Sequence, residues 1–176
     1  MYPSAELWGL EPDPAAATLA GAVYDVTVNA RFPSEQLPRH RFDVVFLNDV
    51  LEHIIDPWSA LAAVKPLLVE DGVVVASIPN ARHVDVWWPL LRHGQFRYTD
   101  IGLLDRTHLR FFTRSSIREM FEGSGWRVDV LQGMNRTRRS PYGDDGWKTR
   151  YLGKLSRGRT DDLFFVQFAV VARLAT

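Results

Sequence analysis

Residues 42–80, FDVVFLNDVLEHIIDPWSALAAVKPLLVEDGVVVASIPN, contain the pattern of a strand, a helix and a second strand. Residues 42–47 are a short apolar run with paired valines, which is typical of a strand that is covered on both faces. Residues 73–78 form a second such run, which ends at a proline and an asparagine. We therefore expect one βαβ unit here.

The helix between these two strands has clear start and stop signals. Asp56 is an N-cap residue, and Pro57 follows it at the first helical position. Apolar residues then recur at helical spacing, and Asp71-Gly72 predicts the end of the helix.

Four polar residues follow the first strand of this unit: Asn48, Asp49, Glu52 and His53. Ligands of open α/β sheets bind beyond the carboxyl ends of the strands. These side chains are therefore candidates for facing a ligand.

The order of NDVLEHIIDP, a helix and a strand ending in PN resembles the class I S-adenosylmethionine-dependent methyltransferases, most closely their small-molecule O-methyltransferase branch. The resemblance implies a Rossmann-like α/β fold, with a mostly parallel sheet closed by a C-terminal antiparallel hairpin. It implies S-adenosylmethionine as cofactor, with Asn48, Asp49 and His53 near its methionine end.

Residues 6–10 read as a strand that ends at Glu11, and residues 14–22 as an alanine-rich helix. The resemblance assigns Glu11 to the ribose hydroxyls of the cofactor, a role that acids after second strands often have. The alternative is a solvated acid that stabilises the following helix N-terminus. Asn29, which follows a strand predicted at residues 23–28, is the corresponding candidate for adenine, or else a turn asparagine.

The 176 residues contain no G-x-G-x-x-G pattern. If residues 6–10 are the family's second strand, its first strand and first helix are missing, and two apolar strand edges need a partner. Either the sequence is a fragment, or its start is misassigned, or another chain fills the gap. A homodimer that covers these edges is one expectation.

The region after Asn80 supplies the candidate substrate residues. Trp88 lies in a short apolar segment, interrupted by Pro89, that could cover the strand ends or belong to the core. The segment LLDRTHLRFFT resembles a part of the same branch that lies near the substrate pocket, and it contains His108 and Arg110. We expect Asn80, Trp88, His108 and Arg110 to contact the substrate. The alternative for the DRTH segment is a network that caps the next helix.

Two histidines are candidates for catalysis, because histidine titrates in the range useful for removing a hydroxyl proton. They are His53 and His108. For His53, support of the cofactor is the alternative role.

The C-terminal half predicts a helix at residues 115–122, capped by Thr113, and a hairpin of residues 126–131 and 163–174. Residues 136–160 form a basic insertion, with eight Lys and Arg against two acids. Such a loop with aromatic residues can bind nucleic acid, but it is more often a solvated connection, so no nucleic-acid partner is predicted.

Composition excludes several other classes. There is no cysteine, so disulfides and thiolate zinc sites are excluded, and the net charge is zero. The histidines show no H-x-x-x-H spacing, and no metal site is predicted. No run is long enough for a membrane span, and a cytoplasmic protein is expected.

The sequence thus predicts one methyltransferase-like domain over residues 1–176, N-terminally incomplete, that transfers a methyl group from S-adenosylmethionine to a small molecule, at oxygen. The alternative is a non-catalytic remnant that acts as an assembly or binding module.

Overall fold

The computed structural model describes residues 5–137 and 161–175. Its strands form two sheets, one of two strands in the order β1-β2 and one of four in the order β3-β4-β6-β5. The elements are β1 (Trp8–Leu10), α1 (Pro14–Ala20), β2 (Val26–Val28), β3 (Phe42–Asn48), η1 (Leu51–His53), α2 (Pro57–Val64), η2 (Lys65–Leu67), β4 (Leu68–Pro79), α3 (Val84–His93), α4 (Arg114–Gly123), β5 (Trp126–Arg136), η3 (Asp161–Phe164) and β6 (Phe165–Leu174).

The predicted βαβ unit is confirmed. Strands β3 and β4 pair in parallel, and α2 crosses between them. Asp56 caps α2, because its Oδ1 accepts the amide of Ser59 at 3.1 Å, and Pro57 occupies the first helical position. The predicted C-terminal hairpin is also confirmed, since β6 pairs antiparallel with both β5 and β4.

The predicted end of α2 at Asp71-Gly72 is wrong. The helix ends at Val64, a short 3-10 turn follows, and Asp71 and Gly72 lie within β4. Pro66 contributes to the early end, because proline lacks the amide hydrogen that would continue the helical hydrogen bonds. Gly72 lies in an irregular part of the β3–β4 pairing, where a Cβ would stand 3.0 Å from the Phe42 carbonyl oxygen.

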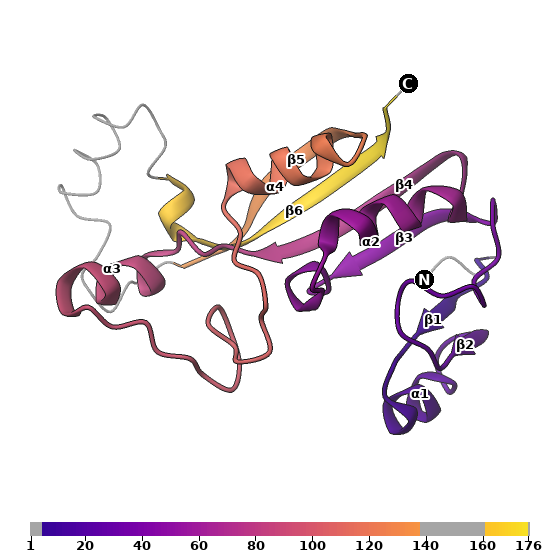
Figure 1. Cartoon of the computed structure of the whole chain (residues 1–176), viewed down its shortest axis with the longest axis horizontal. Helices are drawn as coiled ribbons and strands as arrows, with labels where there is room; N and C mark the ends of the chain where they lie inside the picture. Colours follow the sequence, from indigo (N-terminus) through magenta and orange to yellow (C-terminus); the bar gives the residue numbers. More distant parts are fainter. Residues whose placement is uncertain (1–4, 138–160, 176) are drawn as a thin grey trace.

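The core lies between the four-stranded sheet and helices α2 and α4. Helix α4 begins at the predicted cap Thr113, whose side chain accepts the Ser116 amide in a capping box. The fully buried core side chains include Leu61 of α2, Phe121 of α4 and Trp126 of β5. Figure 1 shows α2 over β3 and β4, and α4 beside β5 and β6.

Strand β3 is less buried than predicted. Leu47 lies in the core, but Val44 and Phe46 are 38% and 64% exposed. Alternate residues of a strand point to opposite faces, so these two side chains occupy the face opposite the core. The prediction of a strand covered on both faces is therefore wrong, because among the described residues α2 and α4 pack on one face of this sheet.

The small sheet of β1 and β2 forms a separate unit with α1, beside the start of β3 (Figure 1). Within the described residues β1 and β3 have no strand pairing, as the missing-strand prediction requires. The units meet where the ring of Trp8 contacts Phe42 edge to face, at 5.7 Å between centroids, and where Arg41 pairs with Glu6.

The apolar segment around Pro89 forms helix α3, which contains this proline and is followed by Gly94 with a left-handed backbone (φ 62°). Of the predicted basic insertion, residues 138–160 lie outside the described residues. Within the described part of the chain, no helix is long and apolar enough to cross a membrane.

Candidate functional site

Glu11 and Asn29 meet at the carboxyl ends of the parallel strands β1 and β2. The Asn29 side-chain amide donates to the Glu11 carbonyl at 2.8 Å, and the Glu11 amide donates to Val28. The Glu11 carboxylate accepts the Asp13 amide at 3.0 Å through one oxygen. The contact with Asp13 also matches the alternative of an acid beside a helix N-terminus, and contact of Glu11 and Asn29 with the cofactor stays a prediction.

Asn48 and Asp49 follow β3, and their environments differ. Asn48 is exposed. Asp49 has a left-handed backbone (φ 51°), and its carboxylate accepts from Ser77 at 3.1 Å and from Gln167 at 2.6 Å. The Asp49 carboxylate thereby links the ends of β3, β4 and β6. Contact of both residues with the cofactor stays a prediction.

The fold brings His53 and His108 together. His53 lies in η1, and His108 lies in the segment between α3 and α4. Their rings pack edge to face, 4.8 Å apart between centroids. The segment is held there by the amides of Leu109 and Arg110, which donate to the Glu52 carbonyl at 2.8 and 3.1 Å.

Both imidazoles have one ring nitrogen bound to a backbone carbonyl. Nδ1 of His53 lies 3.1 Å from the Thr107 oxygen, and Nδ1 of His108 lies 3.3 Å from the Leu103 oxygen. A carbonyl can only accept, so Nδ1 carries the hydrogen in each ring. In the neutral rings Nε2 is then left with its lone pair.

The sequence placed Glu52 in the polar cluster that could face a ligand but gave it no specific role. Its side chain is 1% exposed, and neither carboxylate oxygen has a hydrogen-bond partner among the described residues. Burial raises the pKa of Glu52 to about 7, and the negative charge of Asp49 contributes to the same shift. The Glu52 carboxylate and one nitrogen each of His53 and His108 lie within 4.8 Å of one another. The adjacent residues Glu52 and His53 were the only indication of this cluster in the sequence, because His108 is distant in sequence.

The Arg110 side chain binds a backbone carbonyl close to His53. Its Nε donates to the Ile55 carbonyl at 3.0 Å, and its charge lowers the pKa of Asp56, after the larger effect of hydrogen bonds from Ser59. This contact fixes the turn before α2. Binding of a substrate anion by Arg110 stays a prediction.

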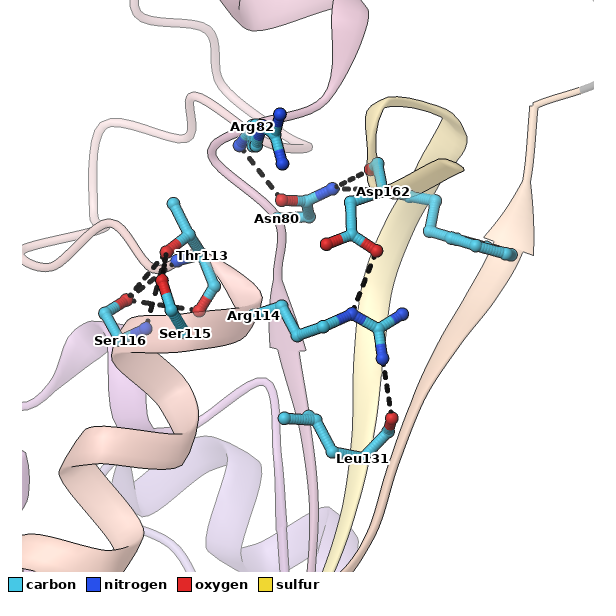
Figure 2. A network of polar contacts seen from close by, with 9 residues as sticks. Asn80, Arg82, Thr113, Arg114, Ser115, Ser116, Leu131 and Asp162 are labelled. Carbon is cyan, nitrogen blue, oxygen red and sulfur yellow. Dashed lines mark hydrogen bonds and ion pairs between the residues drawn. The ribbon is translucent and has the colours of Figure 1, made fainter. Parts of the chain in front are cut away.

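Asn80 is fully buried in a junction of β4, β6 and η3 (Figure 2). Its side-chain amide donates to the carbonyls of Asp162 and Phe165 at 2.6 and 2.8 Å, and its oxygen accepts the Arg82 amide at 2.9 Å. Arg114 continues the junction through an ion pair with Asp162 at 2.9 Å. All these contacts are within the chain, so the geometry gives Asn80 a structural role, and contact with substrate stays a prediction.

Trp88 lies on α3 and is 36% exposed. Its ring packs edge to face on Trp87, at 5.7 Å between centroids. The structure therefore leaves part of this indole accessible, and its role toward a substrate stays a prediction.

The sequence and the fold of the chain were compared with those of known proteins. The chain matches a methyltransferase domain family over residues 2–131. No curated protein sequence matches it.

Three solved structures show the same fold. An S-adenosylmethionine-dependent methyltransferase from Archaeoglobus fulgidus superposes with a TM-score of 0.62 at 15% identity, over 94% of this chain and 74% of that one. A Haloferax volcanii methyltransferase in complex with the Trm112 activator gives 0.59 at 17% identity, over 96% and 71%. The 1,6-didemethyltoxoflavin-N1-methyltransferase of Burkholderia thailandensis gives 0.58 at 16% identity, over 97% and 62%.

The predicted α/β Rossmann-like fold is thus confirmed. The family match spans most of the chain. The chain belongs to the methyltransferase domain family, whose cofactor is S-adenosylmethionine.

Proposed function

We propose that this domain methylates a small-molecule acceptor at a hydroxyl oxygen. The observation that carries the proposal is the convergence of His53 and His108 beyond the carboxyl end of β3. Within residues 5–137 and 161–175, neither Nε2 atom has a backbone partner. Bound S-adenosylmethionine supplies an electrophilic methyl carbon. The protein must then orient the acceptor and remove its proton.

In this proposal an Nε2 atom of the histidine pair accepts the hydroxyl proton as the oxygen attacks. The backbone carbonyls of Thr107 and Leu103 hold the rings in the tautomer that this requires. Glu11 and Asn29 would bind the nucleoside part of the cofactor. Correct positioning and proton removal are the two contributions that this chain's own residues can make.

Calorimetric titration with S-adenosylhomocysteine, followed by a screen of hydroxyl and amine acceptors with mass-spectrometric detection, tests the proposal. We expect micromolar binding, and a gain of one methyl group on hydroxyl acceptors. Methylation confined to amines would overturn the choice of oxygen. Absence of binding at millimolar ligand would overturn the catalytic proposal for this chain.

A second candidate function is assembly. It is favoured by the exposed apolar side chains of β3, Val44 and Phe46, and by the absence of pairing between β1 and β3 in the described residues. Unpaired, apolar strand edges favour association, and a chain of zero net charge does not repel a second copy. This proposal predicts a homodimer in sedimentation that Phe46→Lys converts to a monomer. A wild-type monomer at high concentration would contradict it.

A further inference from the structure

We propose that Glu52, His53 and His108 bind a divalent transition-metal ion. The ligand atoms of these three residues lie within 4.8 Å of one another. Two imidazole nitrogens and one carboxylate oxygen are a donor set that suits Zn²⁺, Fe²⁺, Co²⁺ or Mn²⁺, and suits Mg²⁺ and Ca²⁺ poorly.

The unpartnered carboxylate of Glu52 is the observation that points to a ligand. The Glu52 side chain is 1% exposed and receives no hydrogen bond from any other described residue, so its carboxylate is costly to keep ionised. Buried charges in proteins are normally paired or coordinate a metal. The described neighbours of this carboxylate offer it no cation, and a bound metal ion would supply one.

The histidines are oriented as metal ligands usually are. A ligating imidazole almost always donates its second ring N–H to a carbonyl or carboxylate, which fixes the tautomer and raises ligand basicity. Nδ1 of His53 and of His108 make such contacts with Thr107 and Leu103. Nε2 of each ring is thereby left as the coordinating atom.

The charges around the site also favour a cation. Asp49, three positions before Glu52, places a second carboxylate at the end of β3. Asp105, three positions before His108, adds a third carboxylate, which accepts from Thr107. The nearby Arg110 is bound to the Ile55 carbonyl and lies close enough to Asp56 to lower its pKa.

The present spacing is slightly wider than a loaded site requires. Ligands about 2.1 Å from one ion lie about 3.4 Å apart in tetrahedral geometry. Rotation of the Glu52 carboxylate, together with a shift of the exposed His53 ring on its contact with Thr107, would close the difference. With three protein ligands, at least one coordination position stays open, as in catalytic rather than structural metal sites.

The metal site does not depend on methyl transfer. It deepens the proposed function by changing the group that activates the acceptor, because an Nε2 atom bound to a metal cannot also accept a proton. An acceptor hydroxyl at the open position would lose its proton to solvent more readily, because a coordinated metal lowers the pKa of a bound oxygen. His53 and His108 would then serve as ligands, and the substrate class would be hydroxyl compounds able to coordinate a metal.

The test is titration of the 176-residue chain with Co²⁺, without cofactor, followed by visible absorption and calorimetry. We expect one equivalent to bind with a d–d absorption band, and Zn²⁺ but not Mg²⁺ to displace it. Glu52→Gln, His53→Asn and His108→Asn should each weaken binding by at least about 10-fold. His40→Gln and His93→Gln, which change histidines outside the cluster, are the controls and should bind as the wild type does.

Circular dichroism of each variant separates loss of a ligand from loss of the fold. A folded Glu52→Gln chain that binds Co²⁺ as tightly as the wild type overturns the proposal, as does a wild-type chain that binds no Co²⁺. Loss of metal binding in the folded variants with unchanged S-adenosylhomocysteine affinity supports the metal site independently of the methyl-transfer proposal.

Discussion

His53 and His108 pack edge to face with 4.8 Å between ring centroids, although one belongs to η1 and the other to the segment before α4. The contact is held by main-chain hydrogen bonds, because the amides of Leu109 and Arg110 both donate to the Glu52 carbonyl. Two segments far apart in sequence thus place their polar side chains together, beside the buried Glu52 carboxylate, which has no partner in the part of the chain that the structure describes.

The first prediction concerns catalysis by this pair. His108→Asn and His53→Asn should each lower kcat for a hydroxyl acceptor by about 100-fold or more, because each removes a proton acceptor or a ligand of the same unit. The double variant should be little worse than either single one, since residues that act as a unit are not additive. Steady-state kinetics on the acceptor found by the screen measures this.

His93→Asn, on the exposed end of α3, is the matched control and should keep the wild-type rate. A fall in S-adenosylhomocysteine affinity with unchanged kcat would assign His53 to cofactor support instead.

The second prediction concerns the junction around Asn80. Asn80→Ala should lower the free energy of unfolding by about 2–4 kcal/mol, because it leaves two buried carbonyls and one amide without their partner. Asn48→Ala removes the same amide at an exposed position and should change stability by less than about 0.5 kcal/mol. Urea denaturation followed by tryptophan fluorescence compares the two. Equal effects would contradict the structural role of Asn80.

The sequence predicted the elements of this fold better than their burial. Asp56-Pro57 and Thr113 are local signals, and the structure has helix starts at both. The exposure of Phe46 depends instead on which helices cover the opposite face, which no local pattern reports. The prediction placed residues 68–72 at the end of a helix, because Asp71-Gly72 is a local helix-stop signal. In the structure the whole run from Leu68 to Pro79 is β4, which pairs with β3.

The candidate site was predicted in part for the same reason. His53 and His108 were each identified from their own motifs, but the sequence does not show that their side chains lie close together in the fold. Glu52 was one member of a polar cluster that could face a ligand, without a specific role. Its burial arises only when the segment around His108 folds over η1.

The third prediction is a pH dependence of stability from His83. This side chain is 1% exposed, and burial lowers its pKa below 6.5, while the facing carboxylate of Asp85, 3.6 Å from Nδ1, opposes the shift. Nδ1 accepts the Asp85 amide, so Nε2 carries the hydrogen and donates to Thr137 at 2.9 Å. The folded chain therefore holds His83 neutral.

Because the unfolded chain takes up this proton more readily, the stability that neutral His83 contributes is complete above about pH 6.5 and is lost as the pH falls toward the lowered pKa. His83→Gln should flatten the decline of unfolding free energy between pH 6.5 and 5, and His93→Gln should leave it unchanged. A decline of the same slope in His83→Gln would assign the acid sensitivity to other groups.

The last prediction uses two glycines in different surroundings. Gly72→Ala should lower the free energy of unfolding by about 1–3 kcal/mol, because its Cβ would stand 2.9 Å from Leu68 Cβ and 3.0 Å from the Phe42 carbonyl oxygen. Gly123→Ala, at the end of α4, places a Cβ where nothing lies within 4 Å. It should raise stability by about 0.4–1 kcal/mol, because alanine has less backbone freedom to lose on folding. Thermal unfolding of the two variants measures the contrast, and a tolerated Gly72→Ala would show that β3 and β4 are not packed this closely.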